Sequence, residues 1–197
     1  MNFLAFITYV LVTTFTPGPN NMMAMSNGLH DGFRKTLRFL IGVLVGFFFV
    51  MLLCGYLNFV LVSILPKARF WLNVLGTGYM IYLGIHIALT KQGESTEIDR
   101  PLNTFKAGAL MQFLNLKLIL YGITVFSNFI IPFHQDLPTL TLYTIILAMI
   151  GFIATSCWAA FGVVFRTVFS KYSTVINILL GLLLIYSAIA GFLSAGH

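Results

Sequence analysis

The sequence predicts an all-α, polytopic membrane protein with six transmembrane helices arranged as two inverted three-helix repeats. Of its 197 residues, 59% are hydrophobic and only 8% are charged, whereas about 25% of the residues of an ordinary soluble domain are charged. The mean hydropathy is +0.96. A chain with so few charges cannot cover a water-facing surface, which excludes a soluble globular enzyme.

Six apolar stretches are long enough to cross a hydrocarbon core, which takes roughly 20 residues per helix. They cover residues 3–25, 39–65, 70–90, 106–131, 139–165 and 174–194. The first is interpreted as a retained span rather than a signal peptide, because it has neither a basic n-region nor a small-residue cleavage site followed by soluble sequence. We therefore expect residues 1–197 to form a single transmembrane domain.

The cations predict how the chain is oriented. The net charge of +6 lies mostly in the gaps between apolar runs, so it indicates membrane topology and a lipid bilayer as partner, not nucleic acid. If the N-terminus is outside, the cytoplasmic gaps hold eight of the 11 Lys and Arg residues and the outer gaps hold two. Because cytoplasmic loops carry the excess of cations, both termini are expected outside the cell (inner) membrane, on its periplasmic side.

The longest polar segment, 91–104, divides the chain almost in half. We expect it to be a cytoplasmic linker between two repeat halves at roughly 1–90 and 105–197. With three spans in each half, the halves enter the membrane in opposite directions, which favours the inverted-topology repeat of secondary transporters. The alternative is six unrelated spans, since self-similarity between the halves is faint.

The first stretch is interrupted by the segment Thr16-Pro17-Gly18-Pro19-Asn20-Asn21. Each proline removes a backbone donor, and the glycine adds freedom that a helix would have to freeze out. Carbonyl groups released near the middle of a membrane cannot face lipid. We expect this break to face protein or a water-filled cavity, with the two asparagine amides pairing with the freed backbone. The alternative is a proline kink that only shapes packing.

Lys117 is the only ionisable residue that this map places deep inside a span. It follows Asn115-Leu116 and lies about 16 Å beyond Lys106 at 1.5 Å per residue. An ionisable group at this depth is costly and by default marks a functional site. The alternative is a structural lysine bound by carbonyl groups of a neighbouring helix. Both roles are compatible, since Lys117 could bond the opened first helix and also bind substrate.

Other polar or small residues are weaker candidates. His30 and Asp31 are expected in a solvated loop, with a gating role as the alternative, and His86 is expected at the membrane interface. Gly42 and Gly46 form a GxxxG pattern, which predicts close helix packing. Five tyrosines are expected either to line a cavity or to lie in the aromatic belts, namely Tyr9, Tyr79, Tyr82, Tyr121 and Tyr186.

The sequence contains no HExxH, GxSxG or P-loop motif. No carboxylate falls within a predicted span. Cys54 and Cys157 lie inside apolar runs without metal-ligand spacing, so we expect them to pack as small hydrophobes. We therefore predict that the chain is not an enzyme and has no cofactor and no metal site.

Several motifs resemble the amino-acid exporters of the RhtB/LysE type. They are the segment 16–21, then His30-Asp31-Gly32-Phe33-Arg34, then Gly42 and Gly46, and in the second half Asn115-Leu116-Lys117, where that family usually has Asn-Pro-Lys. The resemblance covers nearly the whole chain and implies export of small amino acids or metabolites, driven by the proton gradient. Softer, mostly apolar matches at 51–54, 112–122, 147–151 and 157–158 favour cysteine and O-acetylserine as substrates.

The substrate is expected near the midplane, between the broken first helix and the fourth. The expected binding residues are Pro17, Gly18, Pro19, Asn20, Asn21, Asn115 and Lys117. A half-helix N-terminus or the lysine suits the substrate carboxylate, and the freed carbonyls and amides suit its ammonium group. Without an acid in the spans, Lys117 is also the candidate for carrying a coupling proton. The alternatives are an exporter of homoserine, threonine or lysine, a passive channel, and a membrane scaffold or partner subunit.

Overall fold

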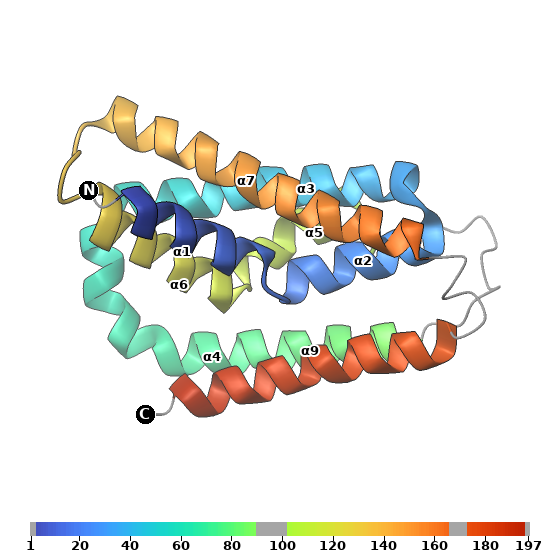
Figure 1. Ribbon diagram of the computed structural model, residues 1–197. Coiled ribbons are helices and arrows are strands. Elements are labelled where there is room, and N and C mark those ends of the chain that lie inside the picture. Colours follow the sequence, from blue (N-terminus) through green and yellow to red (C-terminus); the bar gives the residue numbers. More distant parts are fainter. Residues whose placement is uncertain (1–2, 90–101, 166–172, 196–197) are drawn as a thin grey trace.

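The computed structural model of the chain describes residues 3–89, 102–165 and 173–195, and every regular element in these ranges is a helix. In chain order they are α1 (Phe3–Phe15), α2 (Pro19–Asp31), α3 (Phe33–Tyr56), α4 (Asn58–Ala88), α5 (Phe105–Phe113), α6 (Leu116–Val125), the π-helical turn η1 (Phe126–Ile130), α7 (Leu137–Val164) and α9 (Ser173–Ala195). The helices run roughly along one axis, with α4 and α9 side by side (Figure 1). Most of the predicted linker lies outside the described residues.

The predicted interruption of the first stretch is confirmed. α1 ends at Phe15 and α2 begins at Pro19, so residues 16–18 form the break. Pro19 occupies the first turn of α2, where its missing N–H leaves no intrahelical hydrogen bond unmade. Gly18 precedes it in an extended conformation, with φ −172° and ψ 177°. One apolar stretch therefore becomes two short helices, because the proline segment cannot continue the first.

α2 extends further than the sequence predicts. The expected loop at His30 and Asp31 is wrong, because both residues belong to the last turn of α2, and His30 is only 9% exposed. The turn into α3 consists of Gly32 alone, whose φ of 80° lies in the region that glycine favours. Since a single residue makes the turn, the polar residues before it remain helical.

The boundary between the second and third stretches also differs from the prediction. α3 ends at Tyr56 rather than near residue 65, and α4 continues through the expected gap at 67–69. Asn58, the first residue of α4, is buried, and its Oδ1 accepts a hydrogen bond from Ser127 Oγ at 3.1 Å. This polar contact with the second half holds the turn at Leu57, and hydropathy alone does not locate such a contact.

The second half contains the same order of elements, one interrupted helix followed by two long helices. α5 and α6 are separated at Leu114 and Asn115, and the two parts of this apolar stretch are bent by 61°. Asn115 Oδ1 caps α6 by accepting from the Leu118 N–H at 3.3 Å. Asp136 caps α7 by accepting from the Thr139 N–H at 2.9 Å. α7 and α9 match the predicted fifth and sixth stretches.

Two helices, α2 and α7, approach one another backbone to backbone at glycines. A Cβ added at Gly28 would overlap the carbonyl group of Ala159, and one at Gly162 would overlap the carbonyl group of Met25. Small residues allow helix backbones to come this close. This contact joins a helix of the first half to a helix of the second.

The same kind of contact occurs in two further pairs. A Cβ at Gly42 of α3 would overlap the carbonyl group of Phe105 in α5, which confirms the close packing predicted for the GxxxG pattern. A Cβ at Gly181 of α9 would overlap the carbonyl group of Gly84 in α4. We refer to α2–α7, α3–α5 and α4–α9 as the glycine-packed pairs.

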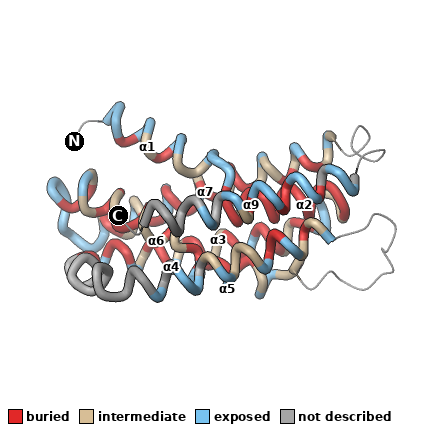
Figure 2. The backbone as a smooth tube through the Cα atoms, turned by 90° about the horizontal axis from the view of Figure 1, so that it is seen from below, coloured by how far each residue is buried: buried red, intermediate tan, exposed pale blue. Residues whose placement is uncertain are grey.

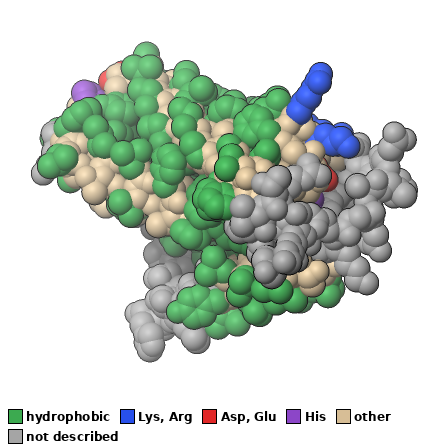
Figure 3. Space-filling model, turned by 45° about the vertical axis from the view of Figure 1, so that its right-hand side comes forward, with side chains coloured by type: hydrophobic (Ala, Val, Ile, Leu, Met, Phe, Trp, Pro, Cys, Tyr) green, Lys and Arg blue, Asp and Glu red, His purple; other side chains and the backbone are tan. Residues whose placement is uncertain are grey.

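The outside of the bundle is apolar. Large side chains such as Leu4, Leu110 and Ile153 are exposed, while buried residues follow the inward faces of the helices (Figure 2). Hydrophobic side chains cover much of the coloured surface in Figure 3, and the Lys and Arg side chains seen there lie together at one end. α3 and α7 are each long and apolar enough to cross a membrane, and α5 with α6 and η1 makes a third, bent span. These features indicate a membrane protein.

Gly84→Ala is expected to destabilise the protein, because the added methyl group would lie 2.7 Å from Ile185 Cγ1 and 2.8 Å from the Gly181 carbonyl oxygen. Overpacking of this kind typically costs about 1–3 kcal/mol. Gly78→Ala on the same helix is the matched control, since nothing lies within 4 Å of a Cβ there. Melting temperatures in detergent measure the difference. Only Gly84→Ala should melt lower than the parent, and equal melting temperatures would contradict the packing of α4 on α9.

Candidate functional site

The two interrupted helices meet, and Lys117 joins them. Its Nζ donates to the Thr16 carbonyl oxygen at 3.1 Å, to Thr16 Oγ1 at 3.0 Å and to the Pro17 carbonyl oxygen at 3.4 Å. The ammonium group thus stands just beyond the carboxyl end of α1, where the helix dipole favours a cation. One of the two predicted roles, bonding the opened first helix, is seen in these contacts. The other role, substrate binding, stays a prediction.

Asn21 satisfies carbonyl groups that the break releases. Its Nδ2 donates to the carbonyl oxygens of Thr14 and Thr16, both at 2.9 Å. Its Oδ1 accepts from Thr155 Oγ1 of α7 at 3.4 Å. Because Asn21 and Thr155 are both buried, the hydrogen bonds from the Asn21 amide lie on a side of the break that faces protein. An interrupted backbone inside a membrane requires such a protein-facing side.

Asn20 links the break of the first half to that of the second. Its Nδ2 donates to Gln112 Oε1 at 2.7 Å, and Gln112 Nε2 donates back to Asn20 Oδ1 at 3.1 Å. Asn115 Nδ2 donates to the same Asn20 oxygen at 3.4 Å. Gln112 is 0% exposed and also donates to the Gly108 carbonyl at 2.8 Å. This reciprocal amide pair is therefore a buried connection between α2 and α5.

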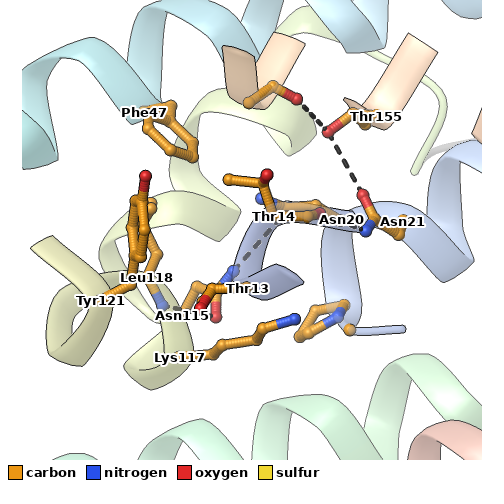
Figure 4. Close-up of a pocket in the computed structure, with 13 residues that line it drawn as sticks. Thr13, Thr14, Asn20, Asn21, Phe47, Asn115, Lys117, Leu118, Tyr121 and Thr155 are labelled. Atoms are coloured by element: carbon orange, nitrogen blue, oxygen red, sulfur yellow. Dashed lines mark hydrogen bonds between the residues drawn. The ribbon is translucent and has the colours of Figure 1, made fainter. Parts of the chain in front are cut away.

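A pocket opens between these polar groups. Side chains from both halves of the chain point into this space (Figure 4). The lining residues are Thr13, Thr14, Gly18, Pro19, Asn20, Asn21, Phe47, Asn115, Lys117, Leu118, Tyr121, Gly151 and Thr155.

The polar side of the pocket contains six of the seven residues that the sequence singles out. These are Gly18, Pro19, Asn20, Asn21, Asn115 and Lys117. Pro17, the seventh, lies in the break and presents its carbonyl group to the lysine. Gly18 leaves room for the lysine chain, since a Cβ there would lie 3.1 Å from Lys117 Nζ and 3.2 Å from Lys117 Cδ.

Other members of the site are not identified by the sequence reasoning. Gln112 is a polar residue in an apolar run, one helical turn before Asn115, and that spacing could have identified it. Thr14 and Phe47 are residue types that are common in apolar spans, so nothing in the sequence distinguishes them. Tyr121, expected only as one of five tyrosines, does line the pocket.

Phe47 and Tyr121 form the aromatic wall of the pocket (Figure 4), and they belong to a larger aromatic cluster. The Tyr121 ring stacks on Tyr9 at 6.0 Å between centroids, and Tyr9 stacks on Phe129 at 5.7 Å. Phe47 of α3 meets the edge of Tyr121 at 6.3 Å. The cluster brings together rings from α1, α3, α6 and η1. It gives the pocket an apolar wall beside its polar one.

The residues that line the pocket offer one cation, several amides and freed backbone carbonyls, and no carboxylate. Among the residues described, no group of three or more His, Cys, Asp and Glu is placed to hold a metal ion. Fixed donors and acceptors beside an apolar wall suit a small zwitterion, because its carboxylate accepts hydrogen bonds and its ammonium group donates them.

Interrupted apolar helices that enclose a polar pocket are an arrangement typical of secondary transporters. The chain belongs to the LysE type translocator family, which matches residues 11–194. It is 41% identical to the cysteine/O-acetylserine efflux proteins of Escherichia coli strain K12 and Shigella flexneri serotype 5b (strain 8401). It is 42% identical to the protein of that description from Escherichia coli O139:H28. Each match spans 185 residues, 94% of this chain and 94% of the relative. No solved structure matches this chain.

Lys117→Ala is expected to abolish transport while the protein still reaches the membrane. The variant removes the only cation that lines the pocket and three donors to the first break. Lys106→Ala, which removes an exposed cation from the first turn of α5, is the control. Efflux from cells, divided by the amount of protein in the membrane fraction, measures the effect. Normal efflux by a well-expressed Lys117→Ala protein would reduce the lysine to a packing role.

Proposed function

We propose that this chain is a secondary exporter that carries small zwitterionic amino acids out of the cytoplasm, with cysteine and O-acetylserine as its main substrates. The observation that carries the proposal is the pocket between the two interrupted helices, where an ammonium group and several amides face an apolar wall. The substrate assignment draws on the relatives, which are cysteine/O-acetylserine efflux proteins similar over 94% of each chain.

In the proposed complex, the substrate carboxylate binds Lys117 in place of the Pro17 carbonyl oxygen, whose distance of 3.4 Å is the longest of the three. A hydrogen bond between two charged groups is stronger than one to a neutral carbonyl, which favours this exchange. The substrate ammonium group donates to Asn20 Oδ1 and to backbone carbonyls at the break. The short substrate side chain then lies against Phe47 and Tyr121.

We also propose six membrane-spanning helices in two inverted repeats, with both termini on the outer side of the inner membrane. The order of elements supports the repeat, since each half has one interrupted helix followed by two long ones. The charges support the orientation. Arg34 and Lys35 in the first turn of α3 and Lys106 in the first turn of α5 lie toward the same end of the bundle, since Gly42 of α3 packs against Phe105 of α5. Such cations favour the cytoplasmic side.

Transport requires that the pocket open to one side of the membrane at a time. We propose that the glycine-packed pairs move against one another as rigid units, which is the alternating access expected of inverted-repeat carriers. The proton gradient drives export, with a proton entering as the amino acid leaves. Contacts between the pairs, including the Asn20–Gln112 amide pair, are then the ones that break and re-form.

Counterflow in proteoliposomes tests the proposed function. Vesicles preloaded with unlabelled O-acetylserine should take up labelled O-acetylserine and, under reducing conditions, labelled cysteine. Homoserine, threonine and lysine should exchange about tenfold or more slowly, because pocket walls discriminate small side chains by about 1–3 kcal/mol per methylene group. A passive channel would equilibrate label without stimulation by the preload, and a scaffold would move none. Preferred exchange of lysine or homoserine would assign the pocket to another amino acid.

A further inference from the structure

His30 is a buried imidazole outside the pocket, and partners hold both of its ring nitrogens. Nδ1 lies 2.7 Å from the Ser26 carbonyl oxygen, and Nε2 lies 2.9 Å from Asn177 Nδ2. The exposed fraction is 9% for His30, 3% for Ser26 and 0% for Asn177. The contact joins the last turn of α2 to α9, so a side chain that the sequence places in a solvated loop connects two buried helix faces.

These partners define the protonation state of the ring. A carbonyl oxygen only accepts hydrogen bonds, so Nδ1 carries the ring hydrogen, and an amide nitrogen only donates, so Nε2 accepts. With the Asn177 amide in this orientation, the Nε2 lone pair is the position that a further proton would take. Histidine is also the side chain whose ordinary pKa lies between pH 5 and 8.

Protonation at Nε2 would place two donors opposite each other. One N–H bond would form with one proton taken up, and the hydrogen bond from Asn177 Nδ2 would be lost, so the amide would have to turn before its Oδ1 could accept from the new N–H. This bond connects two glycine-packed pairs, because α2 belongs to α2–α7 and α9 belongs to α4–α9. The first turn of the same α2 carries Asn20 and Asn21 in the pocket. A change in the hydrogen bonding of His30 can therefore move α2 and, with it, the two asparagines that line the pocket.

The charged groups around His30 lie at the same end of the bundle. Asp31 follows it on α2 and accepts a hydrogen bond from Asn103 Nδ2 at 2.6 Å. It is the only carboxylate that the described residues place at this end. The other neighbouring helices α7 and α9 carry no Asp, Glu, Lys, Arg or His over their described lengths. The remaining charged or titratable groups on the packed elements are Arg34, Lys35, Arg38, Cys54 and Tyr56 on α3, Lys67, Arg69, Tyr79, Tyr82 and His86 on α4, Tyr143 and Cys157 on α7, and Tyr186 on α9.

Lys117 is less suited to carry the proton. Its Nζ donates to three oxygen acceptors, and these three bonds use all three hydrogens of an ammonium group. Loss of a proton would remove one of these bonds and the positive charge that binds the substrate carboxylate in the proposed complex. The geometry therefore favours a lysine that stays charged, and it leaves the coupling proton to another group.

We propose that His30 is the proton-binding group of the exporter, and that protonation at Nε2 releases α2 from α9 so that the pocket, once it has released the amino acid, can turn back to the cytoplasmic side. This inference rests on the proposed function, because it assigns the proton that drives that export. His30 binds the coupling proton but does not contact the amino acid, so it acts on the pocket through the position of α2.

Two assays on one proteoliposome preparation of the full-length protein test the assignment. They are counterflow of labelled O-acetylserine and accumulation of O-acetylserine under an imposed pH gradient. His30→Gln should retain counterflow but accumulate at least tenfold less substrate under the gradient. His134→Gln, which changes an exposed histidine in the segment before α7, should match the parent in both assays. Gradient-driven accumulation by His30→Gln at the parent level would overturn the assignment, whereas absence of counterflow in the parent would overturn the proposed function.

Asn177→Asp gives a second test if His30→Gln loses both activities. A carboxylate beside Nε2 stabilises the protonated ring, and an opposite charge in contact typically shifts a pKa by about 1–3 units. The midpoint of the pH dependence of gradient-driven transport should therefore move upward by about one pH unit or more. A midpoint equal to that of the parent would overturn the assignment, because a group remote from His30 would then set the pH dependence.

Discussion

The interruption of the first apolar helix creates backbone carbonyl groups that need donors inside the membrane, and the rest of the site follows from how they are satisfied. An unpaired polar group in an apolar environment costs roughly 2–7 kcal/mol, so a break of this kind is stable only where donors are fixed beside it. Asn21 supplies donors from the same chain segment, and Lys117 supplies them from the second half. The two halves are therefore bonded at the place where each is interrupted.

The helices are held together by two kinds of contact that differ in stiffness. Within the glycine-packed pairs, backbones touch directly, and a close-packed contact of that kind has little freedom to rearrange. Between the pairs, the polar contacts run through side chains, as in Asn20 with Gln112 and His30 with Asn177. Side-chain hydrogen bonds can exchange partners at modest cost, because each contributes only about 0.5–1.5 kcal/mol net. Movement is therefore expected between the pairs and not within them.

Much of the fold and one side of the site could be predicted from the sequence, because the relevant signals are local. Two prolines around a glycine determine the first break wherever they occur, and a lysine far from either membrane surface must find acceptors. The features that were wrong or missed depend on contacts between distant segments. The end of α3 depends on Asn58 meeting Ser127. The burial of His30 depends on Asn177 of α9, 147 residues further along the chain. Neither partner has a residue type or spacing that marks it in advance.

The aromatic residues of the pocket could not be predicted from the sequence either. Tyr9, Phe47 and Tyr121 resemble the many other aromatic residues of the apolar stretches, and 15% of the chain is aromatic. Only the packing of α1, α3 and α6 around the break brings Phe47 and Tyr121 to the pocket and stacks Tyr9 on Tyr121. Polar residues are rare enough in this chain to be noticed individually, whereas aromatic residues become informative only through their neighbours.

The most direct test of the account is equilibrium binding of O-acetylserine to the purified protein after both prolines of the first break are replaced by alanine. An uninterrupted helix would use the carbonyl groups of Thr16 and Pro17 for its own backbone bonds and would straighten the wall of the pocket. Pro138→Ala, at the first turn of α7, serves as the control for proline removal. The account predicts that the double replacement of Pro17 and Pro19 loses binding while the protein stays folded and the control binds normally. Unchanged affinity in the doubly substituted protein would contradict it.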